Sequence, residues 1–146
     1  MLLLFALGMA SCNRGVVYSH YEHTPTSGWE KNDTLFFKVP PVKEAGVYEE
    51  VLGMRILNDF PFQKLSLVID QMVYPESKHI HKNYDCSLID EQGVIKGYGI
   101  SHIQYEFPLG EITLNEGDSL RIEIRHNMKR EVMPSIADIG IKLRKR

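Results

Sequence analysis

The segment LRIEIR, residues 120–125, sets the expected fold class of this chain. Successive side chains of a β-strand point to opposite faces, so its leucine and isoleucines would share one face while its charged residues face water. A turn sequence, EGD at 116–118, comes directly before it, and IADIGIKL at 136–143 repeats the alternation near the C-terminus. Both segments are therefore predicted to be strands with one buried and one solvated face.

Outward from these segments, short apolar runs alternate with turn residues along the rest of the chain. The further strand candidates are Thr34 to Val39, Tyr48 to Leu57, Leu65 to Tyr74, Tyr84 to Ile89, Val94 to Gly99 and Ile103 to Phe107. None of these runs sustains the periodicity of an amphipathic helix. About seven or eight strands separated by turns predict an all-β chain, folded as an antiparallel β-sandwich of the jelly-roll kind.

Composition limits the classes of partner. At 146 residues, 43% hydrophobic and 25% charged, the chain can form one ordered domain with its own core. Its net charge of −2 provides no overall positive field, so nucleic acid is not an expected partner. The basic residues near the C-terminus, Lys142, Arg144, Lys145 and Arg146, are interpreted as a solvated tail.

The N-terminus has the features of a secretory leader. The first eleven residues carry no charged side chain, and an apolar run at 2–7 is too short to span a bilayer. The residues Met9, Ala10 and Ser11 then lead into Cys12, a pattern that resembles the bacterial lipobox. A basic segment before the apolar run is missing, and the alternative is a buried N-terminal strand or helix with an incidental cysteine. We expect cleavage before Cys12 and acylation of its thiol.

This interpretation divides the chain into three parts. Residues 1–11 would be the signal peptide, and residues 12–28 a polar, aromatic and lipidated tether that ends in the turn sequence TPTSG. Residues 29–146 would form the β-sandwich domain. After acylation Cys86 stands alone, so no internal disulfide is expected and this residue is predicted to be a packed core thiol.

Catalytic and metal-binding motifs are not evident in the sequence. It contains neither Gly-x-Ser-x-Gly nor His-Glu-x-x-His nor a phosphate-binding glycine loop. His79 and His81 are two residues apart, but their polar neighbours indicate an exposed loop and no third ligand lies nearby in the sequence. We therefore expect no metal, no cofactor and no enzymatic activity.

Several segments, taken in order, resemble a single protein family. They are Tyr18 and Tyr21 with Trp29, RILNDFPFQKLSL at 55–67, DEQGVIKGYG at 90–99, RHNMK at 125–129 and IADIGIKL at 136–143. Their order and spacing resemble the gliding-motility lipoprotein GldH family of the Bacteroidetes. That resemblance implies an envelope lipoprotein associated with the gliding and type IX secretion machinery. It provides no catalytic motif whose residues could be transferred to this chain.

Six residues are candidate contacts for a partner or ligand: Trp29, Phe60, Phe62, Tyr98, Arg125 and His126. The phenylalanines flank a proline in a turn, where they could also close one end of a sandwich. His126 ends the strand at 120–125, so it either caps that strand through hydrogen bonds or meets a partner. Gly97 and Gly99 are expected to permit a bulge or a close backbone approach.

Two positions are candidates for O-glycosylation. Thr34 follows Asp33 and Ser119 follows Asp118, and in both cases an apolar residue comes next. These triplets resemble a Bacteroidetes glycosylation signal, although such triplets also arise by chance where a turn leads into a strand.

The leading hypothesis is a structural or accessory lipoprotein that acts through contacts with envelope proteins, held at a membrane by the lipid on Cys12. The residues that follow, NRGV at 13–16, lack the acidic cluster that resembles a surface-export signal, so a periplasm-facing position on the inner or outer membrane is expected. The alternative is a carbohydrate-binding jelly-roll module on a lipid anchor, with Trp29, Tyr98 and Tyr105 as stacking platforms. An exposed, coplanar row of these rings would favour that module, whereas buried rings would favour the structural role.

Overall fold

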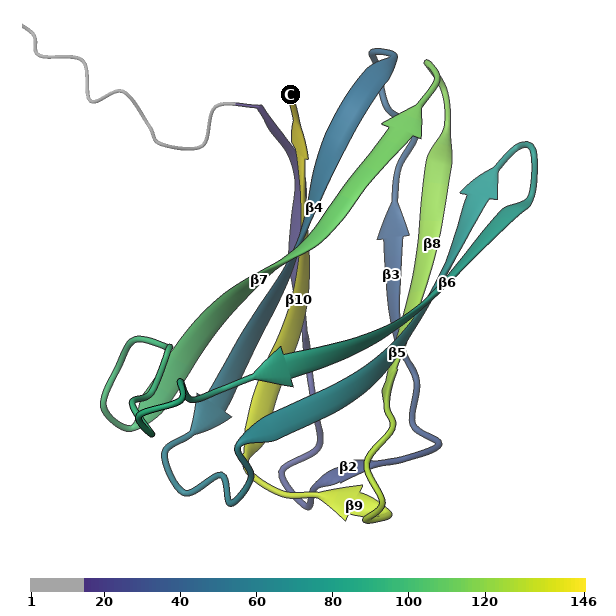
Figure 1. Ribbon diagram of the computed structural model, residues 1–146. Helices are drawn as coiled ribbons and strands as arrows, with labels where there is room; N and C mark the ends of the chain where they lie inside the picture. Colours follow the sequence, from purple (N-terminus) through teal and green to yellow (C-terminus); the bar gives the residue numbers. More distant parts are fainter. Residues whose placement is uncertain (1–14) are drawn as a thin grey trace, which may run out of the picture.

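The computed structural model describes residues 15–146, which form two four-stranded antiparallel sheets packed face to face (Figure 1). The first sheet has the order β1 (Val16–His23), β10 (Ile136–Lys145), β4 (Gly46–Leu57), β7 (His102–Leu114). The second has the order β3 (Leu35–Val39), β8 (Ser119–His126), β5 (Lys64–Tyr74), β6 (Lys78–Ser87). Two short strands, β2 (Trp29–Glu30) and β9 (Val132–Met133), form a separate pair. Cys12 and the predicted leader lie outside the described residues.

The strand pairing is nested. Among the eight longer strands the first pairs with the last, β1 with β10, and the second with the second last, β3 with β8. In the same way β4 pairs with β7 and β5 with β6. A long hairpin that pairs along its whole length and is then rolled into two sheets is a jelly roll. The predicted all-β antiparallel sandwich is confirmed, and the pair β2 and β9 comes in addition to the expected strands.

β8 shows why this sequence folds as a sandwich. Leu120, Ile122 and Ile124 are buried in the core between the sheets, whereas Arg121 and Glu123 lie on the outer face with 3.1 Å between Nη2 and Oε1. Full burial of such an apolar side chain contributes about 1.5–3 kcal/mol relative to exposure. A shift of one residue in register would place the charged residues in the core, so the alternation fixes the pairing of β8 with its neighbours.

The sequence predicts a tether over 12–28, whereas the structure places Val16–His23 in β1, hydrogen-bonded to β10. β1 can pack there because the Tyr21 side chain closely approaches two glycines of the first sheet. A Cβ on Gly53 would lie 2.4 Å from Tyr21 Oη, and a Cβ on Gly140 would lie 2.7 Å from the Tyr21 ring. The ring therefore lies across two glycines, with the Arg55 guanidinium carbon 4.1 Å from its centroid. The sandwich thus begins at Val16, well before Trp29.

The sandwich has two ends, which we call proximal and distal (Figure 1). The chain comes in at the proximal end at Gly15, next to the C-terminus and the connection 40–45 between β3 and β4. The distal end holds β2, β9 and the connections 58–63 and 88–101. In the part of the chain that the structure describes, no helix has the length and apolar character needed to cross a membrane.

Candidate functional site

All six residues predicted as contacts lie at or near the distal end, although they come from four different parts of the chain. Trp29 belongs to β2, Phe60 and Phe62 to the connection 58–63, Tyr98 to the connection 88–101, and Arg125 and His126 to the end of β8. The fold therefore brings them to one end of the sandwich. Their exposure differs greatly, and this difference separates structural residues from surface residues.

Trp29 and His126 lie inside the core. Both are fully buried, with their rings edge to face at 5.3 Å between centroids. His126 Nε2–H donates to the Trp29 carbonyl oxygen at 2.9 Å, and the Met128 N–H donates to Nδ1 at 3.4 Å. The Trp29 indole N–H donates to the Asp33 carbonyl oxygen at 2.7 Å. These bonds require a neutral imidazole, and burial lowers the pKa of His126. The arrangement is that of a strand-end cap, with neither ring at the surface.

Phe60 and Phe62 close the distal end of the sandwich from the side of β4 and β5. Both are half-buried and pack against the core, edge to face with each other at 5.6 Å. Arg125 is half-buried on β8, in register with Val68 of β5. These three side chains keep part of their surface open to solvent, so a partner could reach them from outside.

The most exposed large apolar side chains belong to the connection 88–101. Val94 is 59% exposed, Ile95 51%, Tyr98 84% and Ile100 90%. We call these four residues the apolar loop. Of these four residues only Tyr98 was predicted as a contact, since Val94 and Ile95 lie in the stretch Val94 to Gly99 that was expected to be a strand, and Ile100 follows it. That strand prediction is wrong, since this stretch makes only the isolated bridges Ile89↔Ile95 and Tyr98↔Gln104.

The backbone of the apolar loop is fixed by hydrogen bonds at both of its ends. At one end the Asp90 carboxylate accepts from the backbone N–H groups of Gln92 at 2.9 Å and Val94 at 2.8 Å. At the other end the Tyr98 N–H donates to the Gln104 carbonyl oxygen at 3.0 Å, and the Gln104 N–H donates back at 2.8 Å. The four side chains are thus held outward by an ordered backbone.

Glycine makes this attachment to β7 possible. Gly99 has a φ of +125°, and a Cβ there would lie 1.9 Å from the His102 carbonyl oxygen. A Cβ on Gly97 would lie 2.5 Å from the Ile103 side chain and 2.8 Å from the Gln104 carbonyl oxygen. The predicted close backbone approach at these two glycines is confirmed, and it is what turns the Tyr98 side chain to solvent.

Beside the apolar loop lies a hollow of 940 Å³ between the connection 88–101 and β7. Tyr98 and Tyr105 line it together with the basic side chains of Arg55 and Lys96, the imidazole of His102 and the carboxylate of Glu106. Tyr105 is itself buried, its hydroxyl donates to the Leu88 carbonyl oxygen at 3.0 Å, and burial raises its pKa. The apolar loop therefore lies next to a hollow that carries charged side chains of both signs.

The three rings considered as sugar platforms do not form an exposed row. Trp29 and Tyr105 are buried, while Tyr98 is exposed on the connection 88–101. Stacking on a sugar requires the face of the ring to be accessible, so Tyr98 alone among the three meets that requirement.

In residues 15–146 no group of three or more His, Cys, Asp or Glu side chains is placed to hold a metal ion. His79 and His81 instead share Asp70, whose Oδ1 lies 3.1 Å from His79 Nε2 and 2.6 Å from His81 Nδ1. Partial burial alone would raise the pKa of Asp70, but the hydrogen bonds from the histidines outweigh it and lower that pKa. The proposed glycosylation positions, Thr34 and Ser119, are both half-buried, one just before β3 and the other at the start of β8.

Comparison with known proteins gives one family and several distant structural likenesses. The family model described as GldH lipoprotein matches residues 16–143. A gliding motility lipoprotein GldH homolog of Christiangramia forsetii is 21% identical, with 93% of this chain and 88% of the relative covered. The gliding motility lipoprotein GldH of Flavobacterium johnsoniae is 20% identical, with 98% and 93% covered. Among solved structures, a family 35 carbohydrate binding module from Clostridium thermocellum is 15% identical with a TM-score of 0.41, over 84% of this chain and 86% of that chain.

Proposed function

The chain belongs to the GldH lipoprotein family, a family of gliding-motility lipoproteins of the cell envelope, and we propose that it works by binding envelope proteins of the gliding and type IX secretion machinery. One observation carries this proposal: an ordered loop at the distal end exposes four large apolar side chains. In this role the protein is a structural or accessory component, and its partner docks on the apolar loop.

The anchor in this proposal is the lipid on Cys12, with the domain facing the periplasm. The lipobox pattern before Cys12 supports it, as does the membership in a lipoprotein family. A lipid anchor concentrates the domain at the membrane surface, which raises the effective concentration of any partner on the same membrane. Modest affinity at the distal end is then sufficient for assembly.

The apolar loop has the properties of a binding surface. Single exposed apolar side chains are common on soluble domains, whereas four within one connection often mark a protein contact. Because the Asp90 carboxylate accepts hydrogen bonds from the loop backbone and Tyr98 pairs with Gln104, a partner would lose little binding energy in ordering the loop. Burial of a side chain such as Ile100 contributes about 2 kcal/mol, roughly a 30-fold change in affinity.

The experiment replaces Tyr98 and Ile100 by serine together. The matched control is Phe36→Ser, which removes an exposed apolar side chain from β3, on the outer face of the second sheet. We expect the double variant to reach normal envelope levels and to keep the wild-type melting temperature, while gliding and secretion fall severalfold. The control is expected to behave as wild type.

Crosslinking identifies the partner directly. A photoreactive residue at position 100 is expected to capture an envelope protein in native cells, whereas one at position 36 is not. A double variant that is abundant, folded and fully motile would overturn the docking role. Recovery of polysaccharide alone at position 100 would support the carbohydrate-binding alternative instead.

A further inference from the structure

We propose that the proximal end of the sandwich rests on the lipid bilayer, so that a hollow beside β1 faces the membrane and the apolar loop points away from it. This inference depends on the lipidation of Cys12 proposed above. It goes further because it assigns a membrane-contacting surface and an orientation to the folded domain.

The first step concerns reach. From Cys12 to Val16, the first residue of β1, there are four residue steps, which span at most about 14 Å in any conformation. β1 is itself fixed, because the Lys145 N–H donates to the Gly15 carbonyl oxygen at 2.7 Å and Val16 is in register with Arg144 of β10. An acylated Cys12 would therefore hold the proximal end close to the lipid, with no long tether between them.

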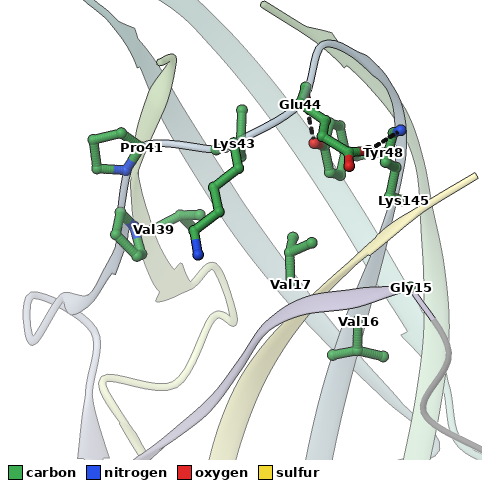
Figure 2. Close-up of a pocket in the computed structure, with 11 residues that line it drawn as sticks. Gly15, Val16, Val17, Val39, Pro41, Lys43, Glu44, Tyr48 and Lys145 are labelled. Atoms are coloured by element: carbon green, nitrogen blue, oxygen red, sulfur yellow. Dashed lines mark hydrogen bonds and ion pairs between the residues drawn. The ribbon is translucent and has the colours of Figure 1, made fainter. Parts of the chain in front are cut away.

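The second step concerns the chemistry of that end. A hollow of 470 Å³ lies between the start of β1 and the connection 40–45 (Figure 2). Its walls include the buried side chains of Val39 and Val42, while Val17, at 47% exposed, and the exposed Pro40 and Pro41 form its rim. An apolar hollow with an apolar rim at the point where a lipid anchor joins the domain matches the interfacial region of a bilayer.

The third step concerns charge and rigidity. The Lys145 ammonium pairs with the Glu44 carboxylate, and the Tyr48 hydroxyl donates to the Glu44 carbonyl oxygen at 2.5 Å, which ties the connection 40–45 to β10 and β4 (Figure 2). That pairing lowers the pKa of Glu44 and raises the pKa of Lys145. Lys43 also lines the hollow and makes no ion pair with any residue of the described chain. Its free ammonium can meet lipid phosphates.

This orientation sets the height of the docking site. β10 has 10 residues and runs from the distal to the proximal end, which corresponds to about 33 Å. The apolar loop would therefore meet its partner roughly 30 Å from the lipid surface, a distance that favours a periplasmic domain or loop as partner over a membrane-embedded segment.

The test uses the full-length lipidated protein in vesicles of phosphatidylethanolamine and phosphatidylglycerol that contain nitroxide-labelled lipid. An environment-sensitive fluorophore is attached in separate variants at Val17→Cys, Pro41→Cys and Ile100→Cys. We expect severalfold stronger quenching by the lipid nitroxide at positions 17 and 41 than at 100. Equal quenching at all three positions, or no quenching at any, would overturn the orientation.

A second measurement tests the chemistry of the hollow. With the fluorophore at Lys43→Cys, replacing both Val17 and Pro41 by serine is expected to reduce quenching severalfold, whereas Val132→Ser at the distal end leaves it unchanged. Undiminished quenching in the folded double variant would refute the apolar contact. Mass spectrometry of the same preparation shows whether Cys12 is lipidated. An unmodified thiol overturns the anchor and the orientation together. A lipidated Cys12 without stronger quenching at positions 17 and 41 overturns this inference alone.

Discussion

Replacing His126 by alanine should destabilise the domain strongly, although this residue is the last of β8. The imidazole is fully buried and donates to the Trp29 carbonyl oxygen at 2.9 Å. Alanine would remove that donor, the edge-to-face contact with the Trp29 ring, and the acceptor for the Met128 N–H. Each loss can be assigned a magnitude.

A buried carbonyl left without its donor costs about 1–3 kcal/mol. The lost aromatic contact adds about 0.5–1.5 kcal/mol, and the space left by the ring adds a cavity contribution. The first two losses together are about 1.5–4.5 kcal/mol, which for a domain of this size lowers the melting temperature by roughly 5–15 °C, and the cavity adds to this. Urea unfolding and calorimetry measure both quantities. Arg125→Ala, which changes the half-exposed neighbour, is the matched control and should cost about 0.5 kcal/mol or less.

The same residue predicts a pH dependence. Burial lowers the pKa of His126 in the folded state below its ordinary value of 6.5. As the pH falls through this range, the unfolded chain therefore binds a proton that the folded chain does not, so stability is lost as the pH drops below about 6.5. His126→Asn should lack this part of the pH dependence. A His126→Ala variant that melts within a degree or two of wild type, or an unchanged pH profile in His126→Asn, would refute the reasoning.

Three further predictions concern other parts of the fold. Burial raises the pKa of the Cys86 thiol to about 12, so it should react with thiol reagents only after unfolding, and rapid labelling of the native domain would contradict its core position. Burial also raises the pKa of Glu50, whose Oε1 is 3.7 Å from Lys82 Nζ. The folded state then keeps a proton that the unfolded chain releases, so the stability gained by Glu50→Gln should increase as the pH rises above 4.5, and a gain that is flat or falls in urea titrations would be inconsistent with this. Gly99→Ala should displace the apolar loop at a cost of about 1–3 kcal/mol and speed hydrogen exchange at the Gln104 amide, and unchanged exchange would show that the loop tolerates a Cβ.

The sandwich could be predicted because its central strands carry their own patterns. β8 alternates strictly between apolar and charged residues, and Leu65 to Tyr74 is nearly continuous in apolar residues, as expected for a strand with neighbours on both sides. Such patterns arise because buried positions take apolar residues, so they can be read from the local sequence alone. The prediction that Cys86 is a packed core thiol is also confirmed, since its side chain is fully buried.

The parts that could not be predicted depend on contacts between distant residues. β1 has the sequence VVYSHYEH, which is polar enough to suggest a tether, because it is an edge strand whose packing relies on Gly53 and Gly140 far along the chain. For the apolar loop the prediction was wrong in the opposite direction. Val94 and Ile95 suggested a strand, whereas hydrogen bonds of Asp90 and Gln104 hold this stretch as a loop whose side chains face solvent. Glycines mark the close approaches at both β1 and the apolar loop. The sequence alone does not show which side chain or backbone segment approaches a given glycine.

The core does not need the side chains of the apolar loop to fill it. The distal end is already closed without it, by Trp29 and His126 on one side and by Phe60 and Phe62 on the other. Two backbone hydrogen bonds between Tyr98 and Gln104 hold the stretch that carries Ile100, and Ile100 is 90% exposed there. The fold therefore holds these side chains in water at a net cost in hydration, and a partner that covers them would recover that free energy without any rearrangement of the sandwich.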